Sequence, residues 1–265
     1  MRGGINVAAT TKGIDCAVPL TAEKAKAMYA AGMRFACRYL VPTSMAWKRL
    51  TRAEAEAITA AGMKIVSVFQ RGTNDAKGGA ANGTRDGKAA YQEAKAIGQP
   101  EGTAIYFAVD YDAQPADYNA IEAYLRAAGT AIMGSVPTKG YYLGVYGSYA
   151  VVEEMAKRIP GIRVWQTYAW SRGNLSKAAN IYQYKNGQTL AGHTVDFNDG
   201  LGNEGWWDTA VQRVEKPVSN TVDKAAAEKV ISVLGALWTA SADKQVQEAA
   251  HFAANALRDA VGIPR

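Results

Sequence analysis

The octapeptide IYFAVDYD, residues 105–112, begins as a buried strand and ends on two acids. Its first five residues are apolar and favour burial, whereas Asp110 and Asp112 favour water. Side chains alternate along a strand, so both carboxyl groups are predicted on one face, roughly 6.6 Å apart along the chain. Tyr106 and Ala108 share that face, and the intervening side chains face covering helices. The stretch therefore predicts an internal strand that carries a pair of acids at its carboxyl end.

Strand-like and helix-like segments alternate on both sides of this octapeptide. The predicted strands are 12–15, 34–40, 64–70, 105–109, 140–149 and 163–170, and the predicted helices are 21–32, 51–62, 85–97, 116–133 and 150–158. Thr51 and Glu54 predict a capping box at the second helix. Alternation at this rate predicts a parallel sheet with covering helices. Five strand–helix units in succession favour a closed barrel over a three-layer sandwich.

The alternation ends after Trp170. The segment between Trp170 and Ile181 is too short for a crossover helix, and Asn186-Gly187 is a strong turn signal. Residues 181–198 are therefore predicted to form two strands joined by a hairpin-like connection. The predicted fold class is α/β: a TIM-like (β/α) barrel of five βα units plus three further strands, with a short C-terminal helical appendage.

The composition changes after the barrel segment. Residues 1–214 are predicted to be the barrel domain, 215–222 a linker, and 223–265 a helical hairpin with apolar stripes on both helices. A hairpin of about 40 residues buries too little surface to stand alone. It is expected to dock on the barrel, on a copy of itself or on a target, and wall binding or association is its possible role.

The overall charge narrows the class of partner. The chain has 265 residues and a formal net charge of +6, which suits nucleic acid, an anionic membrane or an anionic cell-wall polymer. No Lys/Arg run with interleaved aromatics is present, so nucleic acid is not expected as a partner. No apolar stretch reaches the ~20 residues that span a bilayer, so no membrane partner is expected either.

Cysteine usage and the N-terminal sequence give further expectations. Two cysteines, Cys16 and Cys37, and two histidines are too few for a disulfide scaffold or a His/Cys metal site. Both thiols are expected to be free and buried, and no metal or other cofactor is expected. The N-terminal residues 1–15 lack the apolar core of a signal peptide. The protein is therefore expected to be made in the cytoplasm and to act at the cell wall if released.

Two further acids are predicted to join the pair in the octapeptide. Asp15 ends the first strand and Asp196 lies in the last, and these strands are neighbours in a closed barrel. All four acids can then converge at the mouth, where mutual repulsion raises at least one pKa, as a general acid requires. Paired carboxyls suit glycoside hydrolysis. The alternative, that the acids cap strands or pair with neighbouring Arg and Lys, remains open.

Five other polar or aromatic residues at or near strand ends are predicted to bind substrate: Arg38, Gln70, Tyr146, Gln166 and Tyr184. Aromatic faces stack on sugar rings, and amide and guanidinium groups bind hydroxyl and acetamido oxygens. Ordinary barrel packing or rim solvation is the alternative for each. The Gly-rich segment 71–83 lacks the Lys-Ser/Thr ending of a phosphate-binding loop, and we interpret it as a mobile lid or rim loop.

Six segments in order, GID, IYFAVDYD, GVYGSY, VWQTYAW, IYQY and VDFN, carry a family resemblance. Together they resemble a bacterial glycoside-hydrolase-like family, domain-of-unknown-function family 1906. That family is similar to the family 25 glycosidases, muramidases of the bacteriophage endolysin type that cut peptidoglycan. The resemblance covers roughly residues 12–208 and implies a barrel of five βα units plus three strands.

The resemblance also implies roles for the acids. Asp15, Asp110 and Asp196 match acids of the muramidase site, and Asp112 falls where muramidases carry the Glu of an Asp-x-Glu pair, the proton donor. The shorter Asp withdraws the carboxyl by about one C–C bond, and ångström-scale misplacement costs around a hundredfold in rate. Two functions are therefore considered: a lysozyme-like peptidoglycan hydrolase of endolysins or cell-wall remodelling, and a non-catalytic module that binds cell-wall glycan.

Overall fold

The computed structural model describes residues 10–133, 140–210 and 224–263, and the chain divides after residue 213 into two compact units. The predicted linker, 215–222, lies outside the described residues. Residues 1–9, which belong to the segment used for the signal-peptide expectation, lie outside them as well.

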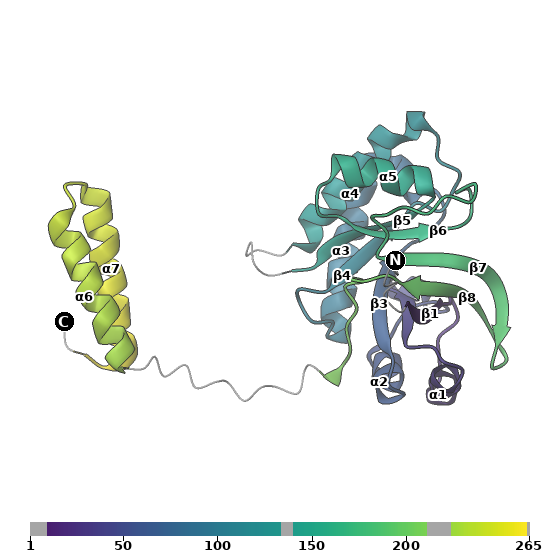
Figure 1. Cartoon of the computed structure of the whole chain (residues 1–265), viewed down its shortest axis with the longest axis horizontal. Coiled ribbons are helices and arrows are strands. Elements are labelled where there is room, and N and C mark those ends of the chain that lie inside the picture. The colour runs from purple at the N-terminus through teal and green to yellow at the C-terminus, as the bar shows by residue number, and fades with distance from the viewer. Residues whose placement is uncertain (1–9, 134–139, 211–223, 264–265) are drawn as a thin grey trace, which may run out of the picture. The chain divides into compact units, whose positions relative to one another are not determined.

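The first unit is a closed barrel of eight strands that follow one another in sequence order (Figure 1). Its strands are β1 Thr11–Asp15, β2 Phe35–Tyr39, β3 Lys64–Phe69, β4 Ala104–Ala108, β5 Tyr142–Gly147, β6 Arg163–Thr167, β7 Ile181–Leu190 and β8 His193–Gly200. Its α-helices are α1 Ala22–Ala30, α2 Arg52–Ala60, α3 Gly79–Ile97, α4 Tyr118–Ile132 and α5 Tyr149–Arg158. Neighbours from β1 to β7 are parallel, and β8 is antiparallel to both β7 and β1. The predicted barrel of five βα units plus three strands is confirmed.

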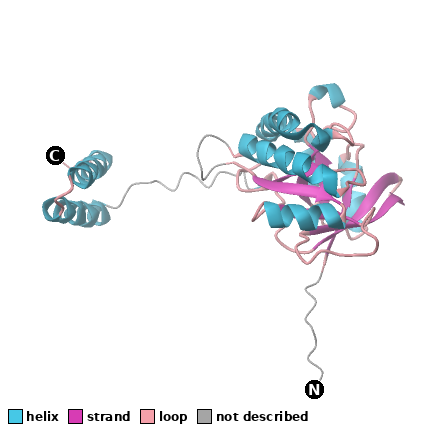
Figure 2. Ribbon diagram, turned by 90° about the horizontal axis from the view of Figure 1, so that it is seen from above, coloured by secondary structure: helices cyan, strands magenta, loops and turns pink. Residues whose placement is uncertain are grey.

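Side chains of the strands alternate between two apolar clusters. Tyr106 and Ala108 of β4 belong to the cluster that fills the barrel, whereas Ile105 and Phe107 belong to the layer under the helices. Figure 2 shows the strands at the centre of this unit with the helices outside them. The alternation predicted from the octapeptide therefore holds as far as β4 extends, which is to Ala108.

The glycine-rich segment 71–83 is not the continuous loop that its composition predicts. A short 3-10 helix, η2 (Asp75–Gly78), leads directly into α3, which begins six residues before the predicted start. A Cβ added at Gly83 would lie 2.1 Å from the backbone oxygen of Tyr124 in α4. Glycine at this position therefore permits close packing of α3 on α4, which composition alone does not reveal.

The turn between β7 and β8 also differs from the prediction. The chain reverses at Ala191–Gly192, where φ is 50° and 67°, and not at Asn186–Gly187. At Asn186–Gly187 the pairing with β8 shifts register, as in a β-bulge. Gly187 has φ of 65°, so this Asn-Gly accommodates a bulge within β7 instead of ending the strand. The two strands form the long curved ribbon of Figure 1.

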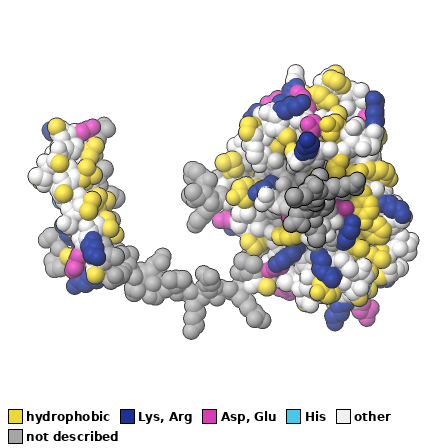
Figure 3. Space-filling view, viewed as in Figure 1, with side chains coloured by type: hydrophobic (Ala, Val, Ile, Leu, Met, Phe, Trp, Pro, Cys, Tyr) yellow, Lys and Arg dark blue, Asp and Glu magenta, His cyan; other side chains and the backbone are white. Residues whose placement is uncertain are grey.

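The second unit consists of two helices, α6 (Lys224–Ala240) and α7 (Lys244–Val261). Small side chains lie buried in it, namely Ala227, Ala250 and Ala254. Four larger apolar side chains of α6 are exposed: Val230, Val233, Leu237 and Trp238. Figure 3 shows hydrophobic side chains along this unit. None of the helices within the described ranges combines the length and the apolar character needed to cross a membrane.

The contact between α3 and α4 gives a test in which packing and helix propensity predict opposite results. Gly83→Ala should lower the free energy of unfolding by about 2 kcal/mol or more, because the added methyl group meets backbone atoms of α4. Propensity alone predicts a gain of about 1 kcal/mol. Urea denaturation measures the difference, with Ala81→Gly at an exposed position of α3 as the control. Stabilisation by Gly83→Ala would contradict the packing argument.

The division into two units gives a second test. A chain that ends at Val214 should keep a folded barrel, because the eight strands and five helices all precede that residue. Near-UV circular dichroism and cooperative thermal unfolding should match the barrel transition of the full chain. An insoluble or molten truncated protein would show that residues 215–265 belong to the core of the barrel.

Candidate functional site

A cavity of about 210 Å³ opens at the carboxyl ends of the parallel strands. It is lined by Asp15, Tyr39, Val68, Gln70, Ala108, Asp110, Tyr146, Trp165, Gln183, Asn186 and Asp196. A larger hollow of about 590 Å³ lies by the amino ends of β5 and β6. Among the described residues that line this hollow, Arg126 is the one charged side chain. The smaller cavity therefore carries the acids and is the candidate site.

Gln183 of β7 connects two of the acids. Its Nε2 donates to Asp15 Oδ2 at 2.9 Å and to Asp196 Oδ2 at 3.3 Å. Its Oε1 accepts hydrogen bonds from the Tyr146 hydroxyl at 2.8 Å and the Thr167 hydroxyl at 2.7 Å. Two hydroxyl donors on Oε1 orient the amide so that its N–H groups face the carboxyls. The side chain is 3% exposed, so this network is buried.

Asn198 of β8 supplies a second amide donor. Its Nδ2 donates to Asp15 Oδ2 at 2.7 Å, and its Oδ1 accepts from Trp165 Nε1 at 2.9 Å. Because the indole nitrogen can only donate, it directs the amide N–H groups toward Asp15. Neither Asn198 nor Gln183 was predicted as a site residue. Strand parity could have found Asn198, since it lies two residues after Asp196 on the same face.

Burial dominates the electrostatics of the acids. Asp15 is 6% exposed, and burial, followed by the charge of Asp196, raises its pKa to about 7. Hydrogen bonds from Asn198 and Gln183 act in the opposite direction. Burial also raises the pKa of Asp196, while the Gly187 N–H, 2.7 Å from Asp196 Oδ1, lowers it. The Asp15–Asp196 pair therefore retains a proton up to about neutral pH.

The two acids of the octapeptide lie in different environments. Asp110 lines the cavity and accepts a hydrogen bond from Gln70 Nε2 at 2.8 Å. Asp112 is exposed and does not line the cavity, and its backbone oxygen accepts from Gln114 Nε2 at 3.1 Å. The strand ends at Ala108, so its alternation does not extend to Asp112. The cavity therefore brings together Asp15, Asp110 and Asp196 without Asp112.

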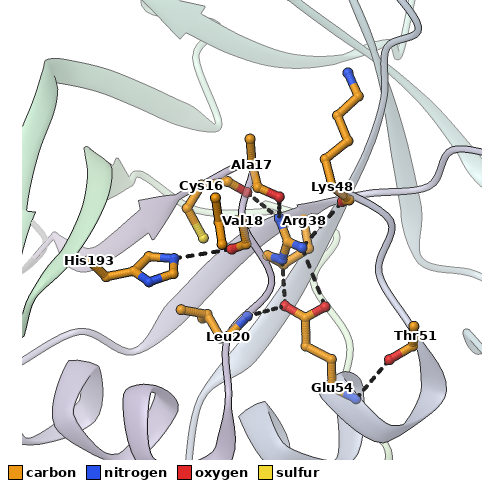
Figure 4. Close-up of polar contacts among 9 residues, drawn as sticks. All are labelled: Cys16, Ala17, Val18, Leu20, Arg38, Lys48, Thr51, Glu54 and His193. Atoms are coloured by element: carbon orange, nitrogen blue, oxygen red, sulfur yellow. Dashed lines mark hydrogen bonds and ion pairs between the residues drawn. The ribbon is translucent and has the colours of Figure 1, made fainter. Parts of the chain in front are cut away.

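Arg38 does not line the cavity. It forms a clamp with the Glu54 carboxylate and the backbone oxygens of Cys16 and Lys48 (Figure 4). It is fully buried and donates from Nε to Glu54 Oε1 at 2.6 Å, from Nη1 to the Cys16 oxygen, and from Nη2 to the Lys48 oxygen at 3.2 Å. Inward positions of β2 are taken by Phe35 and its alternate neighbours, so Arg38 faces the helices. Its position in the helix-facing layer makes Arg38 a structural clamp.

Glu54 belongs to this clamp and not to a complete capping box. Thr51 Oγ1 accepts from the Glu54 N–H at 3.2 Å, as predicted. The Glu54 carboxylate, however, accepts from Leu20 N at 2.8 Å and from Arg38. The ion pair between Glu54 and the buried Arg38 guanidinium is stronger than the hydrogen bond that Glu54 would accept from the Thr51 N–H in a capping box. Cys16, whose oxygen accepts from Arg38, has a free buried thiol, as does Cys37, which confirms the expectation for both cysteines.

Gln166 and Tyr184 also lie away from the cavity. Gln166 donates to the Asn174 oxygen at 2.7 Å and accepts from Ser176 N at 2.8 Å, so it braces the β6–β7 connection. The Tyr184 ring lies 6.1 Å from that of Phe197 and 5.1 Å from Lys12 Nζ. Gln183 of β7 faces inward, as Ile181 does, so the neighbouring Tyr184 faces outward.

Of the nine site residues that the sequence analysis names, five line the cavity: Asp15, Gln70, Asp110, Tyr146 and Asp196. The cavity is also lined by residues that were not predicted as site residues: Tyr39, Val68, Ala108, Trp165, Gln183 and Asn186. Within the described ranges, no group of three or more His, Cys, Asp or Glu side chains is placed to hold a metal ion.

The raised pKa of Asp15 gives a test of the site's electrostatics. Between about pH 4 and pH 7, Asp15 is protonated in the folded protein and ionised in the unfolded chain. The free energy of unfolding therefore falls as the pH rises through this range. Asp15→Asn removes this penalty and can still accept both amide hydrogen bonds. The free energy of unfolding of Asp15→Asn minus that of the parent should be larger at pH 8 than at pH 5, by on the order of 2–3 kcal/mol. Urea denaturation at both pH values measures this, with exposed Asp112→Asn as the control. An equal difference at both pH values would contradict the raised pKa.

Comparisons with known proteins agree with this fold. Residues 26–200 match the family model of the Rv2525c-like, glycoside hydrolase-like domain. The uncharacterized protein FadG of Bacillus subtilis (strain 168) is 31% identical over 157 residues, which are 56% of this chain and 26% of that protein. This chain thus spans about a quarter of the length of that relative.

Two solved structures illustrate the range of the fold similarity. The Mycobacterium tuberculosis Tat-secreted protein Rv2525c, in complex with L-tartrate, has a TM-score of 0.67 and 27% identity, covering 75% of this chain and 100% of that one. A glycosyl hydrolase 25 of Streptococcus pneumoniae has a TM-score of 0.49 and 13% identity, covering 71% and 86%. With a family model matched across most of its barrel, this chain belongs to the Rv2525c-like, glycoside hydrolase-like domain family.

Proposed function

We propose that this barrel is a glycoside hydrolase that cuts peptidoglycan or a related aminosugar glycan, in an endolysin or in cell-wall remodelling. One observation carries the proposal: Asp15 of β1, Asp196 of β8 and Asp110, which follows β4, surround one cavity. Glycosidases act through carboxyl groups gathered around one site in this way.

The size of the cavity suggests where the bond would be cut. A cavity of about 210 Å³ holds about one sugar ring, so the glycosidic oxygen of a longer glycan would lie at the mouth. Asp112, exposed and two residues beyond Asp110, is our candidate proton donor there. Asp110, oriented by Gln70, would stabilise positive charge on the sugar ring or on a substrate acetamido group. Asp15 and Asp196 would hold sugar hydroxyls and tune this pair.

The basic charge supports the proposed setting. A net charge of +6 favours adhesion to an anionic wall polymer. Figure 3 shows Lys and Arg side chains scattered over the visible face of the barrel unit. Action at the wall requires that the protein be released or exported from the cell that makes it, and this location is part of the proposal.

A non-catalytic module that binds cell-wall glycan is the second candidate function. The observation that favours it is the position of Asp112, which is exposed outside the cavity and carries a shorter side chain than the glutamate of muramidases. A barrel of this kind could hold one sugar ring among its acids and amides without cleaving the chain.

Clearing of a peptidoglycan-containing gel, measured between pH 4 and pH 8, tests the proposal. Asp112→Asn should lower the rate of clearing by about a hundredfold or more while glycan binding persists, because the variant keeps the cavity and removes the donor. Asp112→Glu should preserve or raise activity, since it restores the reach of the carboxyl. Glu56→Gln on α2, which is exposed, is the charge-matched control.

Two outcomes would contradict the enzymatic proposal. Clearing by Asp112→Asn at the parent's rate would show that Asp112 is not the acid. Sedimentation of the parent protein with peptidoglycan, without clearing at any pH in this range, would favour the binding module.

A further inference from the structure

Lys48 lies beside the candidate site and is a buried cation without an anionic partner among the described residues. The residue is 5% exposed, and within the part of the chain that the structure describes its Nζ makes no hydrogen bond and no ion pair. Its Nζ lies 4.7 Å from the ring centroid of Tyr39, which lines the cavity, and 5.4 Å from that of Trp47. A lysine that is covered to this extent usually has a charged partner.

The nearby acids do not supply that partner. Burial lowers the pKa of Lys48, and the charges of Asp75 and Asp110 raise it, so both acids lie within electrostatic range. Asp75, however, accepts from the backbone N–H groups of Arg71 and Gly72 at 2.7 Å and 3.0 Å. Asp110 accepts from Gln70. The three N–H donors of Lys48 therefore remain available to a bound molecule.

The position of Lys48 is set by its backbone. Its carbonyl oxygen accepts from Arg38 Nη2 at 3.2 Å, and its N–H donates to the Met45 oxygen at 3.1 Å. Leu50 N donates to the Tyr39 oxygen at 2.8 Å, which ties this loop to the end of β2. Figure 4 shows the Lys48 side chain extending away from the Arg38 clamp. The fully buried Arg38 thus places a second cation at the rim.

Trp47 adds an apolar surface next to this cation. It is 61% exposed, an unusual state for a side chain that gains much from burial. The apolar face of a sugar ring can stack on an indole, and a carboxylate on the same sugar can then reach Lys48 Nζ.

We propose that Lys48, Trp47 and Tyr39 form a rim subsite for a sugar that carries a carboxylate, so that this barrel prefers acidic glycans. This inference rests on the proposed function, a glycan substrate, and adds that the glycan carries a negative charge. A muramic acid with a free lactyl carboxylate and a hexuronic acid share this chemistry. A neutral chitin-type sugar lacks it.

Calorimetric titration of the full-length protein with three disaccharides tests the subsite. The probes are N-acetylglucosaminyl-N-acetylmuramic acid with its lactyl group free, an N-acetylglucosamine–glucuronic acid disaccharide, and chitobiose. The parent should bind at least one acidic disaccharide about tenfold or more tightly than chitobiose, because Lys48 would form a charge-assisted hydrogen bond with the sugar carboxylate. Lys48→Met should abolish that preference and leave chitobiose affinity unchanged, and Lys48→Arg should retain it.

The control is Lys77→Met, which removes an exposed lysine whose Nζ lies 4.5 Å from the ring centroid of Tyr111, a residue that does not line the cavity. Preference for one acidic disaccharide identifies the source of the carboxylate, and preference for both supports recognition of the carboxylate itself. Equal affinity of the parent for all three disaccharides would overturn this inference alone. Equal losses for all three in Lys48→Met would also overturn it, because Lys48 would then only support the rim. Binding of none would overturn the proposed function as well.

Discussion

The pairing of β8 with β1 is the constraint on which the site depends. This antiparallel contact closes the barrel and sets Asp15 directly opposite Asp196 in register. Like charges opposite each other on neighbouring strands are destabilising, and burial of Asp15 adds to the cost. The molecule offsets this cost by amide hydrogen bonds from Gln183 and Asn198 and by a retained proton. The feature that closes the fold therefore also produces the carboxyl group with the most strongly raised pKa among the described residues.

Two polar networks, on opposite sides of the sheet, position the groups around the cavity. Inside the barrel, hydroxyl groups of Tyr146 and Thr167 orient Gln183 toward the acids. Outside it, Arg38 holds backbone oxygens of two loops and the carboxylate of Glu54. A fully buried ion pair contributes little net stability, but its many directional contacts define one arrangement of the loops. Strand alternation assigns each polar side chain to one network or the other.

The site could be predicted in part from strand positions. Asp15, Asp110 and Asp196 were named because strand ends in a parallel barrel meet at one mouth, and all three line the cavity. Arg38 and Tyr184 were named for their chemistry, and each lies one position away from an inward residue, Tyr39 or Gln183. A shift of one residue reverses the face of a strand, so chemical character without parity selects the wrong neighbour.

The sequence by itself determined the order and type of the elements, since side-chain periodicity, capping residues and glycine stops act over a few residues. It also determined that the barrel continues with three strands after five βα units, because residues 171–180 leave no room for a helix. Only the tertiary structure decided that Asn186–Gly187 is a bulge, that Gly83 serves helix packing, and that Lys48 is the cation beside the cavity. Each of these depends on partners far away in the chain: the register of β8, the backbone of α4, and the clamp of Arg38. Side-chain patterns within a few residues do not specify such long-range contacts, so these features are set only when the chain folds.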